Sequence, residues 1–221
     1  MTRVYLVRHA DVENPRRVLY GHLPGFPLSE RGRAQSVEVG RRLVDRGIAR
    51  ILHSPLERAE ETARLIAEQL PAPVPLIPEP ALLEAEFGRY LQGVPYWQIP
   101  VRRPLWLVHK ARRGLLPGDE SIDRMGGRVV EVVHRVAGQH PADASLLVSH
   151  ADPLQAAWLV MDGRRRTERE LYNRPVDRAG VLEVDVEGGR ILAVNYVPPP
   201  APPAPASSDD RQPVSPPSGR A

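Results

Sequence analysis

Short apolar runs alternate with amphipathic patterns of helical period along most of the chain, and this alternation limits the folds open to it. Residues 4–7 (VYLV) and 146–148 (LLV) are apolar runs that predict buried strands. Residues 56–70 and 122–136 carry apolar side chains at spacings of three and four, which is the pattern of one helix face. Strands that alternate with helices in this way indicate an α/β domain built on parallel strands.

The remaining elements complete the predicted fold. A helix is expected from Ser29, as its N-cap, to a stop at Gly47, and a short strand follows at residues 51–52. Late in the chain, residues 181–186 and 191–197 flank a Gly-Gly pair and predict a β-hairpin. We therefore expect a three-layer α/β/α sandwich, in which helices flank a mostly parallel sheet, with a C-terminal β-hairpin.

The C-terminal end of the chain differs from the rest in composition. Residues 198–221 hold nine of the 25 prolines and have no periodic apolar face, so we expect a Pro-rich disordered or extended tail. Residues 1–197 are then expected to form one domain. Two stretches within it, at residues 71–80 and 96–116, are expected to be surface excursions rather than a second core.

Composition excludes several classes of function. The chain has no cysteine, so disulfides, cysteine-based zinc sites and thiol nucleophiles are ruled out. Its 30 basic residues are nearly balanced by 27 acidic ones, which disfavours nucleic acid as a partner. No apolar run approaches the ~18 residues of a membrane span, and no signal-peptide pattern follows Met1. We expect a cytoplasmic protein that does not bind membranes.

Basic residues follow three of the predicted strands at their carboxyl ends. Arg8 and His9 follow the first strand, Arg58 lies one turn into the helix after the second, and His150 follows the later one. Ligands of open α/β sheets bind at this edge. Two arginines and two histidines gathered there would form a cationic pocket for a dianion such as a phosphoryl group.

These residues also carry a resemblance to a known family. Residues 6–10 (LVRHA) resemble the RHG signature of the histidine phosphatase superfamily, also called the phosphoglycerate mutase-like family. Four further segments resemble motifs of that family and follow in the family's order. They are residues 21–32 (GHLPGFPLSERG), 54–63 (SPLERAEETA), 83–88 (LEAEFG) and 147–150 (LVSH). The resemblance implies an enzyme of phosphoryl transfer that needs no metal or other cofactor.

The resemblance implies a role for each matching residue. His9 would be the nucleophile that becomes phosphorylated, and Glu84 would be the general acid that protonates the leaving oxygen. Arg8, Arg58 and His150 would hold the phosphoryl oxygens. A neutral imidazole can form such an intermediate, and guanidinium groups offset the charge that phosphoryl transfer develops. Glu84 would have to be protonated, so its pKa is expected to be raised.

Some positions depart from the family pattern. Ala10 and Ala151 stand where the family usually has glycine. Glu86 is a second carboxylate near Glu84, but the register of the motif favours Glu84 as the acid. Asn14 and His22 match the family less directly but are also expected to bind substrate. Asn14 lies about one residue before the position at which this loop often has Asn in the family. The predicted substrate-binding residues are Arg8, Asn14, His22, Arg58 and His150.

Substrate identity is expected to depend on two segments, residues 14–27 and 90–117. The second contains aromatic and basic side chains that could contact a leaving group. They are Tyr96, Trp97, Arg102, Arg103, Trp106, Arg112 and Arg113.

The function favoured by the sequence is a metal-independent phosphatase whose partner is a small phosphorylated metabolite. A phosphoglycerate mutase is the alternative, because residues 91–93 (LQG) resemble a mutase segment. However, the mutase-like motif has Arg directly after the catalytic Glu, where this chain has Ala85. A non-catalytic phosphate-binding regulatory module is disfavoured because the expected catalytic residue types are all present. A divalent-metal hydrolase is a further alternative, but no recognised metal-ligand spacing in this chain supports it. Its candidate ligands would be His9, His22, His53 and His150. The oligomeric state stays open, with a homodimer as one option.

Overall fold

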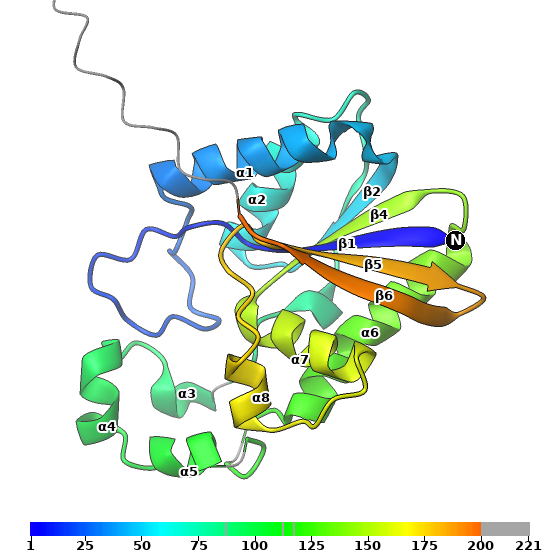
Figure 1. Cartoon of the computed structure of the whole chain (residues 1–221). Helices are drawn as coiled ribbons and strands as arrows, with labels where there is room; N and C mark the ends of the chain where they lie inside the picture. The colour runs from blue at the N-terminus through cyan, green and yellow to red at the C-terminus, as the bar shows by residue number, and fades with distance from the viewer. Residues whose placement is uncertain (87, 112, 117, 200–221) are drawn as a thin grey trace, which may run out of the picture.

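The structure is a computed structural model of the 221-residue chain, and it describes residues 1–86, 88–111, 113–116 and 118–199 (Figure 1). All but the first two residues of the predicted tail therefore lie outside the described residues, and so does Arg112. No helix in the described part is long and apolar enough to cross a membrane.

A mixed sheet forms the middle layer of the fold and has, within the described residues, six strands in the order β3-β2-β4-β1-β5-β6. The strands that pair in parallel are β1 (Thr2–Arg8), β2 (Ile48–His53), β3 (Leu76–Pro78) and β4 (Ala144–Ser149). The two C-terminal strands, β5 (Val181–Glu187) and β6 (Arg190–Val197), pair antiparallel with each other, and β5 also pairs antiparallel with β1. The predicted hairpin and the mostly parallel sheet are confirmed.

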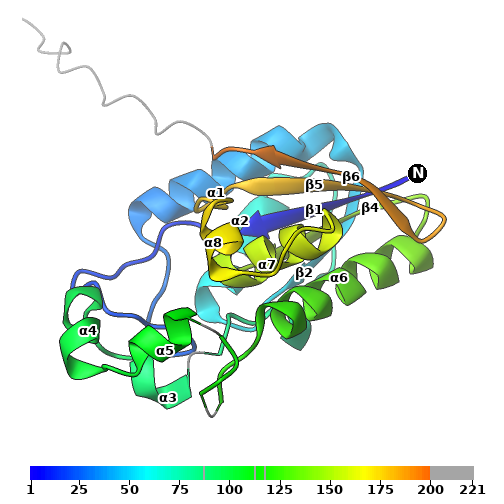
Figure 2. The same cartoon turned by 60° about the horizontal axis from the view of Figure 1, so that its bottom comes forward.

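Helices cover both faces of the sheet, as Figures 1 and 2 show. One face carries α1 (Glu30–Leu43) and α2 (Glu57–Ala67), and the other carries α6 (Ile122–Gln139) and α7 (Ala151–Met161). The short helix α8 (Glu168–Tyr172) follows α7. The three-layer α/β/α sandwich is therefore confirmed.

Strand β1 shows how the sequence produces these layers. Side chains alternate between the two faces of a strand. Tyr5 and Val7 accordingly belong to the apolar cluster that contains α1 and α2, whereas Val4 and Leu6 belong to the cluster that contains α6 and α7. All four side chains are at most 1% exposed. An apolar run without polar interruption is what a strand buried on both faces requires.

Helix α1 begins at the predicted residue. The hydroxyl of Ser29 accepts a hydrogen bond from the Gly32 backbone N–H at 3.1 Å, which caps the helix. A short 3-10 turn (Val44–Arg46) follows the helix, and Gly47 then takes a left-handed conformation with φ of 65°. A side chain at Gly32 would not fit, because its Cβ would lie 2.0 Å from the Asp11 carbonyl oxygen. This contact fixes the start of α1 against the loop that follows β1.

Residues 71–80 lie on the surface, as expected, and they include the edge strand β3, which the sequence analysis did not predict. Its residues are exposed and pair only with β2 in the described sheet. Proline is tolerated at such an edge, where one side of the strand donates no ladder hydrogen bond. The pattern of a buried strand was therefore absent from the sequence.

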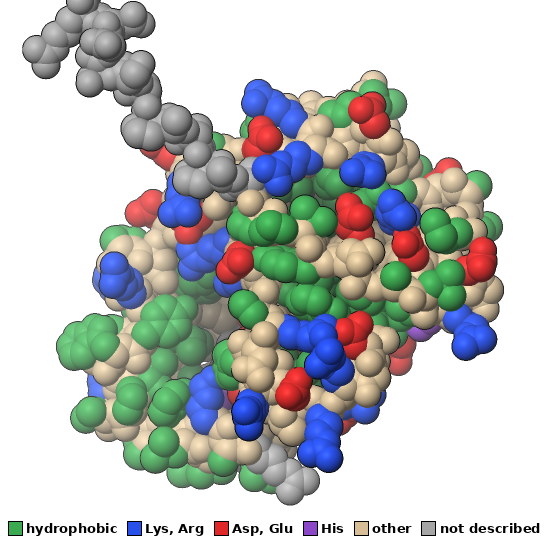
Figure 3. Space-filling model, in the orientation of Figure 1, with side chains coloured by type: hydrophobic (Ala, Val, Ile, Leu, Met, Phe, Trp, Pro, Cys, Tyr) green, Lys and Arg blue, Asp and Glu red, His purple; other side chains and the backbone are tan. Residues whose placement is uncertain are grey.

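The stretch between β3 and α6 contains short helical elements at one end of the molecule (Figures 1 and 2). They are the 3-10 helices Pro80–Leu82 and Tyr96–Gln98 and the helices α3 (Gly88–Leu91), α4 (Ile99–Arg102) and α5 (Trp106–Ala111). A small cluster of Leu91, Val94 and Ile99 holds this segment together. Figure 3 shows hydrophobic side chains gathered over this part of the surface.

Candidate active site

The carboxyl ends of three adjacent strands bring the predicted residues together. Arg8 ends β1 and His9 follows it, Arg58 lies in the first turn of α2 after β2, and His150 follows β4 as the residue before α7. Because β4 pairs in parallel with both β1 and β2, these ends meet at one edge of the sheet. The His9 backbone N–H donates to the Ser149 carbonyl at 2.9 Å, which ties the two histidine segments together.

The His9 ring is buried, and its neighbours fix its protonation. Its Nδ1 lies 2.8 Å from the Ala10 carbonyl oxygen, which can only accept, so Nδ1 carries the proton. Nε2 is then free of a proton and accepts from Nε of Arg58 at 3.3 Å. Burial, together with the charges of Arg58 and Arg8, lowers the pKa of His9 well below its usual 6.5. The residue is a neutral imidazole with its lone pair on Nε2.

Two arginines, Arg58 buried and Arg8 half-buried, supply the positive charge of the site. Arg58 is 2% exposed, donates from Nη2 to the Gly21 carbonyl at 2.8 Å, and has its guanidinium carbon 4.7 Å from the centre of the Tyr20 ring. Arg8 donates from Nη1 to the Val176 carbonyl at 2.8 Å. Its Nε is buried and has no hydrogen-bond partner among the described residues. Leaving a buried donor unpaired is costly, and an anion in the cavity would satisfy it.

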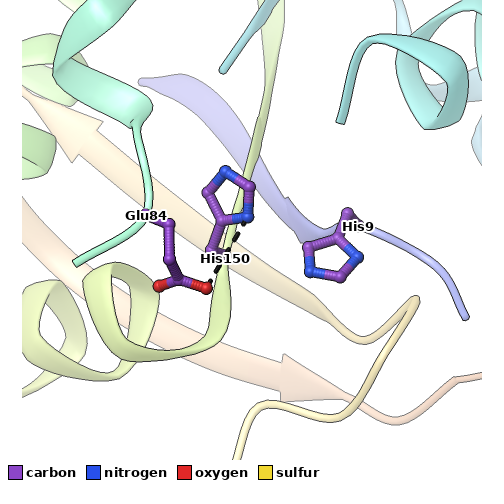
Figure 4. A group of neighbouring side chains, drawn as sticks. All are labelled: His9, Glu84 and His150. Atoms are coloured by element: carbon purple, nitrogen blue, oxygen red, sulfur yellow. Dashed lines mark ion pairs between the residues drawn. The ribbon is translucent and has the colours of Figure 1, made fainter. Parts of the chain in front are cut away.

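Glu84 and His150 lie beside each other and face His9, as Figure 4 shows. Oε2 of Glu84 is 3.8 Å from Nδ1 of His150, and the centres of the two histidine rings are 5.1 Å apart. Nε2 of His150 is 2.8 Å from the hydroxyl oxygen of Ser54. Burial raises the pKa of Glu84, and the Asp152 carboxylate raises it further, although Arg58 acts against both. Glu84 is thereby favoured as the protonated acid.

Asn14 and His22, the other two predicted substrate-binding residues, do not line the cavity beside His9. Both polar atoms of the Asn14 amide bind the backbone of Val18, at 2.9 and 3.1 Å. His22 donates from Nε2 to the backbone carbonyl of Glu84 at 2.7 Å. These two side chains hold loops of the site in place. Glu86 is exposed and does not line the cavity, which favours Glu84 as the acid.

The cavity beside His9 has a volume of about 430 Å³ and includes charged residues that the sequence analysis did not identify. Arg178, in the loop before β5, lines it and forms an ion pair with Asp11. Asp152 lines it from the first turn of α7, and its carboxylate is 2.6 Å from Nη1 of Arg113. Of these two residues, only Asp152 could have been suggested by the sequence, because it lies two residues after His150.

His9, Glu84 and His150 could also be considered as metal ligands, because their ligand atoms all lie within 4.8 Å of one another. The electrostatics of the site argue against a cation there. The guanidinium of Arg58 donates to the nitrogen of His9 that a metal would need, and the Arg8 guanidinium adds a second positive charge nearby. The cluster therefore fits an anion better than a divalent metal ion.

Comparison with known proteins identifies the family. Residues 4–197 match the model of the histidine phosphatase superfamily (branch 1), and the chain belongs to this superfamily. An uncharacterised protein of Mycobacterium tuberculosis is 33% identical over 210 residues, which cover 90% of this chain and 98% of that protein. A Hydrogenobacter thermophilus protein provisionally named phosphoserine phosphatase 2 is 30% identical over 199 residues, covering 88% and 94%.

Other relatives, from Cronobacter and Salmonella, are provisionally named phosphoglycerate mutases. Among solved structures, Bacillus stearothermophilus YhfR superimposes with a TM-score of 0.77 at 24% identity, covering 87% of this chain and 95% of its own. That structure shows the same fold. The relatives by sequence are thus of phosphatase and mutase type, which supports a phosphatase-type enzyme.

Proposed function

We propose that the chain is a metal-independent phosphatase that hydrolyses phosphomonoesters of small metabolites through a phosphohistidine on His9. The hydrogen bond from Nδ1 of His9 to the Ala10 carbonyl carries this proposal. It holds the proton on Nδ1 and leaves the lone pair on Nε2, next to Arg58 and in a cavity that Arg8 and Glu84 also line. A nucleophile with its lone pair fixed next to two cations is suited to attack a phosphoryl group.

The reaction then has two steps. In the first, Nε2 of His9 attacks phosphorus, the bond from phosphorus to the leaving oxygen breaks, and Glu84 gives its proton to that oxygen. Arg8, Arg58 and His150 hold the three remaining oxygens. In the second step, water attacks phosphorus and gives a proton to the Glu84 carboxylate, while the bond from phosphorus to Nε2 breaks and its electron pair returns to His9. Inorganic phosphate leaves, and both His9 and Glu84 return to their starting protonation states.

The surroundings of Ala85 favour water over a phosphoglycerate as the acceptor. A mutase must hold an anionic acceptor, and the mutase-like motif does so with an arginine directly after the acid. Ala85 is 1% exposed and packs in an apolar cluster with Ile122 and Met125. A guanidinium at that position would be buried among apolar side chains without a partner.

Phosphate release tests the proposal. The protein is incubated with phenyl phosphate in the presence of EDTA and without any bisphosphoglycerate primer, and vanadate, a mimic of five-coordinate phosphorus, is added as inhibitor. We expect steady phosphate release, inhibition by vanadate and loss of activity in His9→Ala, with His134→Ala in helix α6 as the matched histidine control. Primer-dependent interconversion of 2- and 3-phosphoglycerate with negligible phosphate release would instead favour the mutase.

A further inference from the structure

The cavity beside His9 has an apolar wall beyond its phosphoryl-binding end. Six apolar residues, from the loop after β1 and from the segment between α3 and α5, form this wall. They are Leu19, Leu91, Tyr96, Ile99, Pro100 and Trp106. Backbone hydrogen bonds between Leu19 and residues 93–94, at 2.8 and 2.9 Å, join the two segments. The wall is backed by the cluster around Val94, so it is a packed surface.

Three charged side chains that line the same cavity already have partners of opposite charge. Arg178 is paired with Asp11, and Asp152 with Arg113. Lys110 lies 4.0 Å from a carboxylate oxygen of Glu168 and contacts the hydroxyl of Tyr172. Arg178 and Lys110, which line the cavity together with Arg8, therefore each have a carboxylate of the protein within ion-pair distance, and this partly neutralises them as partners for a carboxylate on the substrate.

The apolar character continues outward from the wall onto the surface. Trp97 is 74% exposed, Val101 is 85% exposed and Leu105 is 49% exposed, and all three lie in or beside the segment that builds the wall. Figure 3 shows the hydrophobic side chains gathered over this part of the molecule. Apolar surface next to a cavity is typical of a site that takes an apolar ligand.

We propose that the substrate is a phosphomonoester of a bulky apolar alcohol, with an aryl group or an alkyl chain of several carbons. For its reacting end, this inference rests on the proposed function. A cavity of about 430 Å³ is within the size range of sites for ligands much larger than a three-carbon acid. Phosphoserine and phosphoglycerate, the compounds in the names of the relatives, are small and anionic, and the apolar wall offers them little contact.

A series of n-alkyl phosphates from methyl to hexyl tests the inference, because their leaving oxygens differ little in basicity while apolar contact grows. Each methylene that reaches the wall should raise kcat/KM by up to about fourfold. We expect kcat/KM for hexyl phosphate to exceed that for 3-phosphoglycerate and O-phosphoserine by at least about 100-fold, which is the product of three to four such factors. Trp106→Ala and Tyr96→Ala should flatten the rise with chain length, so that hexyl phosphate loses more of its kcat/KM than methyl phosphate does. Leu192→Ala, which removes an exposed apolar side chain on β6 outside the lining, is the control and should not change the dependence on chain length.

Binding of n-alkylphosphonates, measured by calorimetry, separates this inference from the proposed hydrolysis. Phosphonates are not hydrolysed, so the change of their affinity with chain length reports the wall without any chemical step, and the affinity should rise with chain length and lose that rise in Trp106→Ala. Length-dependent binding without phosphate release from any ester would overturn the proposed function and keep the apolar site. Phosphate release from all esters at similar kcat/KM, or a preference for O-phosphoserine, would overturn the substrate class and keep the hydrolysis.

Discussion

Replacement of Arg58 by methionine should change both the rate and the pH dependence of phosphate release. The guanidinium is 2% exposed and donates to Nε2 of His9, so it is positioned to hold the phosphoryl group as charge develops. Removing one donor of this kind costs about 10²–10³ in rate. Methionine keeps most of the buried volume, and the cation has no carboxylate closer than the 4.0 Å to Glu84 within the described residues. The free energy of unfolding should therefore change by less than about 2 kcal/mol.

The pH profile adds a second readout that a structural role alone would not produce. Arg58 lowers the pKa of His9 and also that of Glu84, so both pKa values rise when the cation is removed. His9 must be neutral to attack, so the acid limb of kcat/KM moves to higher pH. Glu84 must be protonated to act as the acid, so the alkaline limb also moves to higher pH.

The measurement is kcat/KM for phosphate release from phenyl phosphate between pH 4 and 9, for the parent, Arg58→Met and Arg64→Met. Ionisation of the substrate is the same in all three, so differences report the enzyme. Arg64 lies on the same helix, is 53% exposed and pairs only with Glu68 among the described residues, and its variant should match the parent. A rate loss below tenfold, or limbs that stay in place or move apart, would refute the reasoning.

Three further predictions follow from particular contacts. Glu84→Gln should lower kcat/KM for alkyl phosphates by about 10²–10⁴ but spare kcat/KM for p-nitrophenyl phosphate, whose leaving group needs no proton, and Glu86→Gln should change neither; equal losses of kcat/KM on both substrates would move the acid elsewhere. His22→Ala removes the hydrogen bond to the Glu84 carbonyl, so it should lower kcat for alkyl phosphates more than for p-nitrophenyl phosphate. An unchanged ratio of kcat between the two substrates would count against a positioning role for His22. Gly32→Ala, with its Cβ 2.0 Å from the Asp11 oxygen, should lower the free energy of unfolding in urea by about 1–3 kcal/mol or more, whereas Gly127→Ala, with open space around it, should not lower it.

The sheet and the main helices were predictable because their signals are local. A strand buried on both faces needs an unbroken apolar run, and a capped helix needs a side-chain acceptor such as that of Ser29, so both leave a mark in the sequence. Strand β3 left no such mark, because it is an exposed edge of three residues, and helix α8, although Thr167 caps it, has only five residues and shows no periodic apolar face. Such short elements depend on tertiary contacts more than on propensity.

The gathering of Arg8, His9, Arg58 and His150 was also predictable, because parallel strands bring their carboxyl ends to one edge. The position of Arg178 at the cavity was not predictable from the sequence, because the antiparallel pairing of β5 with β1 brings it there from far along the chain. The side-chain partners of Asn14 and His22 could not be predicted either. Both bind backbone carbonyls in three dimensions, and residue type alone does not distinguish such a contact from a contact with substrate.

The most direct test of the central claim is to trap the covalent intermediate. The protein is mixed with phenyl [³²P]phosphate and quenched in alkali within milliseconds, and the labelled peptide is identified by mass spectrometry. We expect label that is stable to alkali, is lost in acid as a phosphoramidate should be, and maps to His9, with none in His9→Ala. Steady phosphate release with no labelled protein, or with label on another residue, would contradict the mechanism.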